Sequence, residues 1–449
     1  MTISFGAKLA AAVTVLVAGI LGELYVLSLH WERKARLLFV QFLILVQAVL
    51  ILLSRFVWNN FSTVFDKAPQ KEGLRHVKYS DKDLHQKGVI QLDRKNWTIW
   101  RIFLITYLVS CHISYFMNFY FIGREPYAIA YSCNAALGLL FQLVTGLVFV
   151  KVIMFGFRFI FKSNLVFTKQ RESQLVLIYA ILLWTYGLYN ATTPPVVKEV
   201  PIPVKGLPAS LDGLKIVQIS DIHLGPTVGR WRLTRIVNII NKQNADVVVM
   251  TGDLVDGSVA NLEEAVEPVK HIQSKFGKYF ITGNHEYYTG DVDNWFSHLR
   301  GLGFIVLHNS NVRLPSEKLP TNQQICLAGT DDIHALKIGY GDHGMKLDDA
   351  LGSCDPSQPV ILLAHQPKAA KTALDSKYRV DVVLSGHTHG GQFFPVMFGS
   401  YFLHPFFSGL YRYGETSHVY VSMGTQYFGI PMRIGTTMEV TRIILTQAP

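Results

Sequence analysis

Acidic and imidazole side chains recur at five places in the second half of the chain, each time directly after a short apolar run. In chain order these places are Asp221-Ile-His223, Gly252-Asp253-Leu-Val-Asp256, Gly283-Asn284-His285-Glu286, His365, and Gly386-His387-Thr-His389. Oxygen and imidazole ligands without a thiolate suit Mn, Fe, Zn or Co. Seven such groups exceed the needs of one ion and fit two divalent cations roughly 3.5–4 Å apart. We therefore predict a two-metal site with Asp253 as the shared ligand.

The spacing within two of these motifs supports convergence on a common centre. Asp221 and His223 are separated by one residue, and so are His387 and His389. Side chains within a strand alternate between faces, but past the end of a strand two such residues can turn to the same point. The glycines around the second pair allow unusual backbone angles and leave room for ions and substrate. One such residue alone is more typical of a turn or a helix cap, whereas the ordered set of five indicates a site.

The elements that must position these residues alternate between strands and helices. Strands are predicted at 215–220, 246–251, 278–282, 360–364 and 380–385, and helical spacing occurs at 231–240 and 262–276. This alternation predicts a layered α/β domain with a largely buried sheet. In open α/β sheets, sites form beyond the carboxyl ends of the strands. The five motifs are therefore expected to share one rim.

The first half of the chain has a different composition. Up to residue 197 it holds 20 Lys and Arg against 9 Asp and Glu, and its apolar residues come in long blocks. A basic excess confined to the apolar half points to a membrane lipid surface and not to nucleic acid. About five membrane helices are predicted, at 7–29, 37–58, 102–122, 127–155 and 174–190. The expected domains are a transmembrane region at 1–192, an extended proline-rich linker at 193–210, and an α/β domain at 211–449.

Charge in the connecting segments predicts the orientation of the chain. The connections after the second and fourth helices carry twelve Lys and Arg, and those after the first and third carry four. The positive-inside rule then places the amino terminus inside and the α/β domain on the lumenal or extracellular side. The four cysteines, Cys111, Cys133, Cys326 and Cys354, follow no metal or disulfide spacing, so neither a zinc ribbon nor a disulfide framework is predicted.

As an ordered set, the five motifs resemble the signature of the calcineurin-like metallophosphoesterase superfamily: D-x-H, G-D-x-x-D, G-N-H-[DE], H and G-H-x-H. The resemblance spans about residues 214–441 and implies a four-layer αββα sandwich that hydrolyses phosphoesters, with metal-bound hydroxide as the nucleophile. It implies that Asp221, His223 and His389 hold one cation, that Asn284, His365 and His387 hold the other, and that Asp253 lies between them. His285 would stabilise the transition state or protonate the leaving oxygen, and Asp256 would orient it or merely cap a helix.

One departure from that pattern narrows the class of substrate. Protein phosphatases of the superfamily carry Arg directly after the second Asp, whereas Asp256 is followed here by Gly257. A phosphodiester, including one on a lipid, is therefore favoured over a phosphoprotein. The aromatic-rich stretch 393–411 could form an acyl-chain groove, a membrane-dipping loop, or core and lid packing. Two other functions stay open: a catalytically silent membrane receptor or scaffold, and a channel or transporter with an attached phosphoesterase.

Overall fold

Within the residues that the structure describes, four long helices precede the α/β part of the chain. The computed structural model describes residues 31–65, 99–120, 128–161 and 168–448. The long helices are α2 (Trp31–Phe61), α3 (Ile99–Tyr120), α4 (Ala128–Phe161) and α5 (Lys169–Thr192). All four are long and apolar enough to cross a bilayer. They match four of the five predicted membrane helices, and the predicted helix at 7–29 lies outside the described residues.

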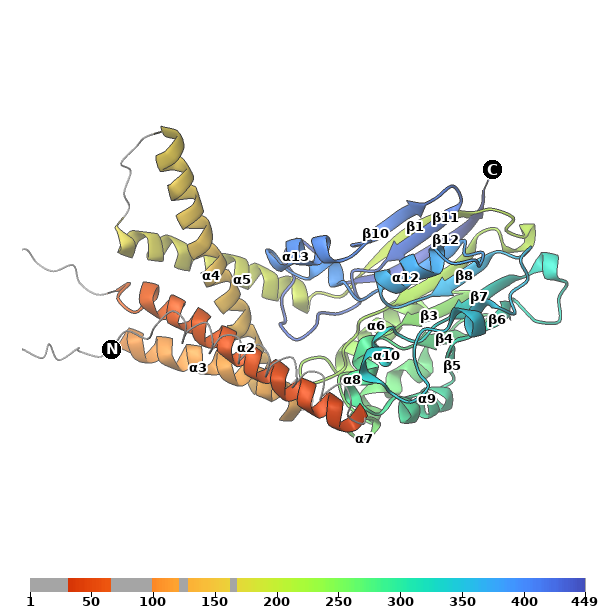
Figure 1. Ribbon diagram of the computed structural model, residues 1–449, viewed down its shortest axis with the longest axis horizontal. Coiled ribbons are helices and arrows are strands. Elements are labelled where there is room, and N and C mark those ends of the chain that lie inside the picture. Colours follow the sequence, from red (N-terminus) through yellow and green to blue (C-terminus); the bar gives the residue numbers. More distant parts are fainter. Residues whose placement is uncertain (1–30, 66–98, 121–127, 162–167, 449) are drawn as a thin grey trace, which may run out of the picture.

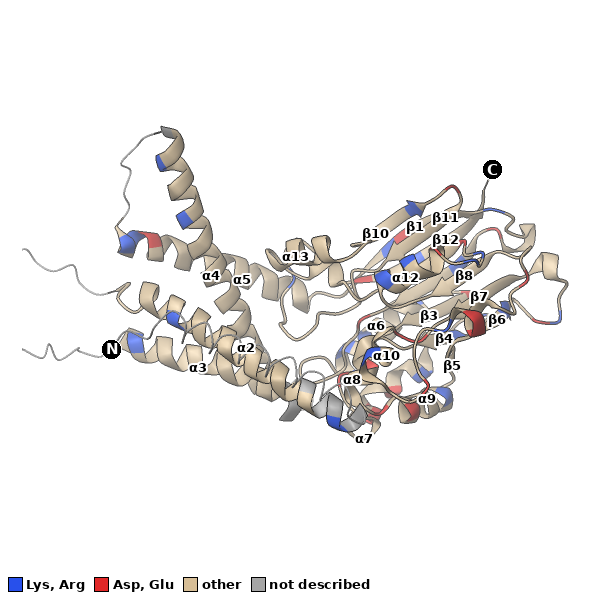
Figure 2. Ribbon diagram, in the orientation of Figure 1, with Lys and Arg blue, Asp and Glu red and all other residues tan. Residues whose placement is uncertain are grey.

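Charged side chains separate the two parts of the molecule. The long helices are largely free of Lys, Arg, Asp and Glu along their middle turns, whereas the α/β part carries both signs over its surface (Figure 2). The apolar side chains on the outside of the helices, such as Leu52, Val152 and Leu182, are exposed. Surfaces of this kind are expected on helices that lie in lipid. The chain is therefore a multi-pass membrane protein.

Two six-stranded sheets form the α/β part, in the strand orders β1-β12-β2-β3-β4-β5 and β10-β11-β9-β8-β7-β6. Pairing is parallel except between β12 and β2, β10 and β11, and β6 and β7. The first sheet contains β1 (Val196–Val204), β2 (Leu214–Ile219), β3 (Val247–Thr251), β4 (Lys278–Ile281), β5 (Ile305–Val306) and β12 (Glu439–Gln447). The second contains β6 (Ser310–Leu314), β7 (Ile325–Gly329), β8 (Val360–Leu363), β9 (Val382–Ser385), β10 (Gly409–Tyr413) and β11 (Ser417–Val421). All five predicted strands are present, as β2, β3, β4, β8 and β9.

Helices cover the outer face of each sheet, so the domain has four layers (Figure 1). The helices are α6 (Arg230–Asn241), α7 (Val259–Val266), α8 (Asn284–Thr289), α9 (Val292–Gly301), α10 (His334–Ile338), α11 (Leu347–Leu351), α12 (Pro367–Leu374) and α13 (Val396–Leu403). The α6, α7 and α9 helices pack on the first sheet, and α11 and α12 pack on the second. Alternate residues of both sheets, such as Val249 and Leu363, form the core between them. The predicted αββα sandwich is confirmed.

Two predicted elements differ from the structure. The helix predicted at 262–276 is interrupted, because α7 ends at Val266 and a 3₁₀ turn containing Pro268 follows. The segment predicted as an extended linker contains β1, which pairs in parallel with β12 along the outer edge of the first sheet. Val200, Ile202 and Val204 alternate into the core, and Pro201 and Pro203 are tolerated because β1 is an edge strand.

A disulfide joins Cys326 in β7 to Cys354 just after α11, with the two Cα atoms 5.8 Å apart. The prediction that the cysteines form no disulfide is therefore wrong. The two residues are 28 positions apart with no neighbouring cysteine. Only the packing of α11 over the second sheet brings them together, and no sequence spacing reports that packing. Cys111 and Cys133, in the long helices, are free and buried.

The long helices contact the α/β part through its carboxyl-terminal loops. The Arg433 backbone N–H donates to the Gly187 carbonyl of α5 at 3.0 Å, and Asn190 Nδ2 donates to the Arg433 carbonyl at 3.1 Å. On α4, Gln142 Nε2 donates to the Phe394 carbonyl at 2.8 Å. Both contacted segments follow strands of the α/β part, so the edge of the domain that carries the predicted metal ligands faces the long helices.

Candidate metal centre

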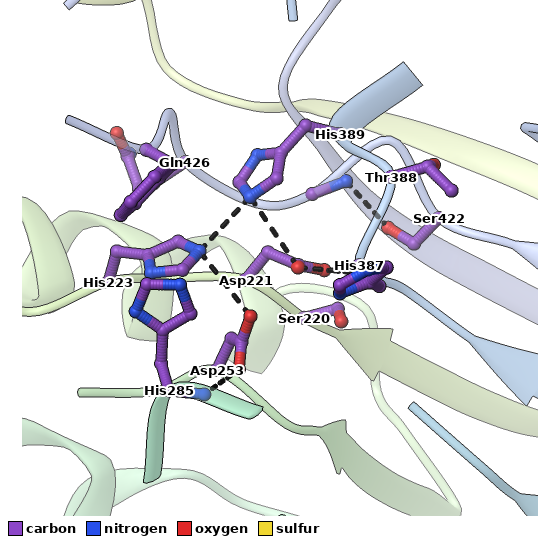
Figure 3. Close-up of polar contacts among 12 residues, drawn as sticks. Ser220, Asp221, His223, Asp253, His285, His387, Thr388, His389, Ser422 and Gln426 are labelled. Atoms are coloured by element: carbon purple, nitrogen blue, oxygen red, sulfur yellow. Dashed lines mark hydrogen bonds and ion pairs between the residues drawn. The ribbon is translucent and has the colours of Figure 1, made fainter. Parts of the chain in front are cut away.

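Five loops bring the predicted ligands to one rim. Asp221 and His223 follow β2, Asp253 follows β3, Asn284 begins α8 after β4, His365 follows β8, and His387 and His389 follow β9. The rim therefore takes loops from both sheets, which lie face to face across the central core. Figure 3 shows the side chains of His223, His389, Asp221 and Asp253 turned toward one another. The convergence expected from the sequence is what the fold produces.

Asp221, His223 and His389 form the first group of predicted ligands. Each offers one atom, and the three atoms lie within 4.8 Å of one another. His223 Nε2 is 3.0 Å from His389 Nε2, and His389 Nε2 is 3.5 Å from Asp221 Oδ1 (Figure 3). All three residues are buried. Two imidazoles and a carboxylate at this separation are typical of a divalent-cation site.

Asp253, His365 and His387 form the second group, and their ligand atoms also lie within 4.8 Å of one another. His365 Nε2 is 3.1 Å from Asp253 Oδ2. The same Oδ2 atom is 3.8 Å from His223 Nε2 of the first group. Asp253 therefore stands between the two groups, in the position expected of a shared ligand.

Buried polar atoms without partners provide a test of fit for cations. His365 Nδ1 donates to the Thr251 carbonyl at 2.7 Å, so its Nε2 lone pair faces the site. His223 Nδ1 likewise donates to Asp256 Oδ1 at 2.9 Å and leaves Nε2 facing the site. Within the described residues, His365 Nε2 and Asn284 Oδ1 are buried and make no hydrogen bond. Buried polar atoms are rarely left so, and these two fit a metal ligand role.

The backbone at the rim adopts an uncommon conformation. Eight non-glycine residues in the described ranges have positive φ, and five of them are predicted ligands: Asp221, His223, Asp253, His387 and His389. A positive φ is unfavourable for a residue with a side chain. Strain of this kind persists where the surrounding structure enforces it and is concentrated at functional sites. The backbone of these loops therefore accepts an unfavourable conformation that turns the predicted ligands toward the site.

The charge states of the ligands depend on their burial. Burial lowers the pKa of His387 and His389 well below the ordinary value, which leaves neutral rings with a free lone pair. Burial opposes ionisation of Asp253, but His365 and His285 outweigh it and hold its pKa well below the usual range. Burial also opposes protonation of His365, and Asp253 nevertheless raises the pKa of that ring. A cation bound between these two side chains would compete with any proton on the His365 ring.

His285 lies beside the two groups of ligands. Its backbone N–H donates to Asp253 Oδ1 at 2.8 Å, and its Nδ1 is 2.8 Å from Asp256 Oδ1. Asp256 also accepts from His223, so one carboxylate holds both rings. Burial opposes protonation of His285, but Asp253 and Asp256 raise its pKa to about 9. The predicted pairing of Asp256 with His285 is present in the structure, and the second pairing with His223 was not anticipated.

Three further residues support the site without having been predicted to do so. The buried Glu286 carboxylate accepts the backbone N–H groups of Gly283, Asp253, Leu254 and Val255, at 2.6, 3.0, 2.7 and 3.3 Å. Arg433, fully buried, donates to the His389 carbonyl at 2.7 Å. The Phe428 ring packs against His223 and His285, with centroid distances of 4.7 Å to each. Glu286 stands in the GNHE motif, but no sequence signal marked Phe428.

The acidic pair Asp331-Asp332 serves the local fold. Asp331 Oδ1 pairs with His308 Nδ1 at 2.8 Å, and Asp331 Oδ2 accepts the Gly344 N–H at 3.2 Å. Asp332 accepts the His334 N–H at 2.8 Å and the side-chain amide of Gln366. These contacts hold the pair in a turn between β7 and α10.

Gly386 provides a test of how closely the rim is packed. A Cβ at this position would lie 2.0 Å from Ser220 Oγ and 2.3 Å from Asp221 Oδ2. We expect Gly386→Ala to displace Asp221, to destabilise the fold by about 1–3 kcal/mol, and to lower activity by about 10²-fold through misplaced ligands. Metal content and thermal unfolding of the purified chain measure both effects. Gly301→Ala is the matched control, because a Cβ there meets nothing within 4 Å; equal behaviour of the two variants would contradict the packing argument.

Comparison with known proteins agrees with this geometry. Residues 214–391 match the family described as calcineurin-like phosphoesterase. The chain is 43% identical over 365 residues to "Transmembrane protein with metallophosphoesterase domain" of Danio rerio, covering 78% of this chain and 81% of that protein. It is 40% identical over 462 residues to the protein of that name from Bos taurus, covering 100% and 99%. It is 33% identical over 252 residues to "Uncharacterized metallophosphoesterase" of Aquifex aeolicus, covering 56% and 91%. Taken with the ligand-bearing rim and the four apolar helices, these matches show that the chain belongs to the calcineurin-like phosphoesterase family, as a membrane-spanning member.

Proposed function

We propose that this protein is a two-metal hydrolase of phosphodiesters, acting at the membrane that its helices span. The observation that carries the proposal is the convergence of six predicted ligands, in two groups, on one buried rim, with ring nitrogens facing inward. Oxygen and imidazole ligands suit Mn, Fe, Zn or Co. When bound, two such cations would supply positive charge to the phosphoryl oxygens and would lower the pKa of a water molecule.

The proposed ligand sets follow the two groups seen in the structure. Asp221, His223 and His389 would hold one cation, and Asn284, His365 and His387 would hold the other. Asp253 would contribute to both, because its Oδ2 atom lies near His365 and His223. Asp256 and Thr251 fix the rings of His223 and His365 through Nδ1, which keeps the opposite nitrogen available.

His285 is proposed to donate a proton to the departing oxygen of the ester. A half-buried ring beside two carboxylates keeps its proton at neutral pH, which an acid catalyst requires. Asp256 is proposed as the positioning residue for this ring, because it accepts the Nδ1 proton and leaves Nε2 to face the substrate. The side chain of His285 is 17% exposed, so the ring borders the solvent side of the site.

A phosphodiester fits this rim better than a phosphoprotein does. Gly257 stands where protein phosphatases of the superfamily carry a phosphate-binding arginine. The partly exposed rings of Phe428 and Tyr288 flank His285, at centroid distances of 4.7 and 5.2 Å. A diester carries one negative charge fewer than a monoester and one organic group more. Aromatic surface beside the site can receive that second group.

Metal dependence tests the proposal directly. We expect the full chain, purified in detergent, to hydrolyse bis(p-nitrophenyl) phosphate and to lose that activity after treatment with a chelator. Readdition of Mn, Fe, Zn or Co, one metal at a time, should restore it. We expect p-nitrophenyl phosphate and a phosphoserine peptide to be poorer substrates. A silent receptor or scaffold would instead bind well under one ion per chain by elemental analysis and would hydrolyse none of the three.

The α/β part is proposed to lie on the lumenal or extracellular side. The charge of the connecting segments favours this orientation. The Cys326–Cys354 disulfide adds support, because disulfides persist mainly in oxidising compartments. In sealed vesicles from cells whose thiols were blocked during lysis, we expect Cys326 and Cys354 to resist alkylation until reduced. A carboxy-terminal tag should be protected from added protease in microsomes. Free thiols together with a digested tag would reverse the orientation.

A further inference from the structure

The α13 helix is an apolar element that the described part of the chain leaves largely exposed. Within it and the flanking stretch 393–411 there is no Asp, Glu, Lys or Arg. None of its eight residues is buried. Phe402 is 81% exposed and Leu403 is 70% exposed, and Phe398 and Tyr401 are also exposed. In Figure 2 the helix carries neither positive nor negative side chains. An aromatic surface of this kind facing water would be unfavourable, so the structure requires something to cover it.

The position of α13 identifies what covers it. The helix lies on the side of the α/β part that faces the long helices (Figure 1). Phe394, just before α13, stacks on Phe149 of α4 with a centroid distance of 5.5 Å. Farther along α4, Val152 and Ile153 are exposed apolar residues of a candidate membrane span. The apolar surface of α13 therefore continues that of a helix expected to lie in lipid.

The same segment is joined to the metal-ligand rim. The His404 ring, directly after α13, packs against the ring of His387 at a centroid distance of 5.3 Å. Thr388, between the two predicted histidine ligands, donates its hydroxyl to the Phe407 carbonyl at 2.7 Å. Before α13, Gln392 Nε2 donates to the Phe428 carbonyl at 3.0 Å. Because these contacts join α13 to the rim, the position of α13 at a membrane sets the distance between the rim and that membrane.

We propose that α13 inserts into the interfacial layer of the same bilayer that holds α4 and α5, and that it presents the rim to phosphodiesters of membrane lipids. Aromatic and apolar side chains are the residues that proteins use to enter this layer. The lipid part of the substrate would stay in the bilayer beside α13, and the phosphate would reach the ligand rim. This inference rests on the proposed function for its substrate, whereas the insertion of α13 can be tested without any activity.

A fluorescent label at position 402 tests the insertion. The full chain with Phe402→Cys is labelled with an environment-sensitive dye and placed in phosphatidylcholine–phosphatidylglycerol nanodiscs. We expect lipids with a nitroxide on the acyl chain to quench this label at least about threefold more than a label at exposed Glu415→Cys. The unsubstituted chain measures background from the buried Cys111 and Cys133. Quenching of the label at position 402 by an aqueous nickel complex would overturn the insertion. Shielding of that label by a second copy of the chain, without quenching by the nitroxide lipids, would overturn it as well.

Two matched probes test the lipid substrate. They are p-nitrophenyl phosphodiesters that differ only in carrying a methyl or a hexadecyl group. In nanodiscs we expect kcat/KM for the hexadecyl probe to exceed that for the methyl probe by about tenfold or more. Phe402→Ser combined with Leu403→Ser should remove this preference and leave hydrolysis of the methyl probe unchanged. Leu319→Ser, an exposed apolar position elsewhere on the α/β part, is the control.

The outcomes of the two tests can be told apart. Equal rates for the two probes in the unsubstituted chain would overturn the lipid substrate and leave the phosphodiesterase standing. Hydrolysis of neither probe would contradict the proposed function itself, and the nitroxide measurement would still decide where α13 lies.

Discussion

Asp253→Asn is expected to give a folded protein that has lost tight binding of at least one cation and nearly all hydrolysis of bis(p-nitrophenyl) phosphate. The Asp253 carboxylate is 3.1 Å from His365 Nε2, 3.8 Å from His223 Nε2, and accepts the His285 N–H. An amide offers one oxygen in place of two and carries no charge. Removing one partner of a buried charged group costs about 3–5 kcal/mol, which corresponds to roughly 10²–10⁴-fold in cation affinity.

Elemental analysis and kinetics measure the two effects of this substitution separately. Metal content per chain should fall below that of the unsubstituted protein, and excess Mn should restore little of the rate. Asp349→Asn, at an exposed position in α11, is the matched control and should change neither quantity. Thermal unfolding of the chelated proteins shows whether the variant folds. A variant with unchanged metal content and unchanged rate would mean that Asp253 is not a ligand.

The sequence predicted the parts of the structure that short segments determine by themselves. Each strand that ends at the rim is a short, largely apolar run followed by polar residues, so its position could be predicted from composition. Asp221 and His223 could likewise be assigned to one centre, because they are close in the sequence and both follow a strand. The order of the motifs then supplied the family resemblance, and with it the sandwich of two sheets. Strand ends and ligands were therefore predictable together.

Contacts between distant segments were not predictable in the same way. The β1 strand contains Pro201 and Pro203, and only its pairing with β12 at the far end of the chain makes it a strand. Cys326 and Cys354 meet because α11 packs on the second sheet. Phe428 reaches His223 and His285 from a loop more than a hundred residues away in the sequence. In each of these examples the signal lies in the pairing of two segments, which a single sequence does not contain.

The role of α13 is a further feature that the sequence did not decide, because both core packing and membrane contact were possible for it. Its composition, rich in Phe and Tyr, is equally suited to a buried lid and to a bilayer surface. The deciding fact is that α13 is not buried while neighbouring Phe393 is, in contact with Phe141 of α4. Burial of one half of an aromatic segment against a membrane helix, and exposure of the other half, depends on the tertiary fold. The sequence alone predicted an aromatic, apolar segment, but it did not predict which of its side chains are buried and which are exposed.

His285→Ala is expected to leave metal content unchanged and to lower kcat, by an amount that depends on the leaving group. His285 is placed by Asp253 and Asp256 and belongs to neither proposed ligand set. General acid catalysis contributes about 10²–10⁴-fold where the leaving oxygen needs a proton. A p-nitrophenolate departs readily without one, whereas an alkoxide does not. The loss should therefore be much larger for alkyl phosphodiesters than for bis(p-nitrophenyl) phosphate.

The pH dependence of the same variant gives an independent readout. Burial opposes the charge on His285, and the two carboxylates raise its pKa to about 9 in the metal-free chain. Cations in the site would act against this rise by repulsion. The protonated ring is the donor, so kcat should fall as the pH rises through the pKa of His285, and His285→Ala should lack this alkaline fall. Asp256→Asn should retain His285 but move the fall to lower pH, because the carboxylate that stabilises the protonated ring is gone.

His271→Ala, at an exposed position, is the control and should keep the profile of the unsubstituted chain. An alkaline limb that is identical in all four proteins would exclude His285 as the acid.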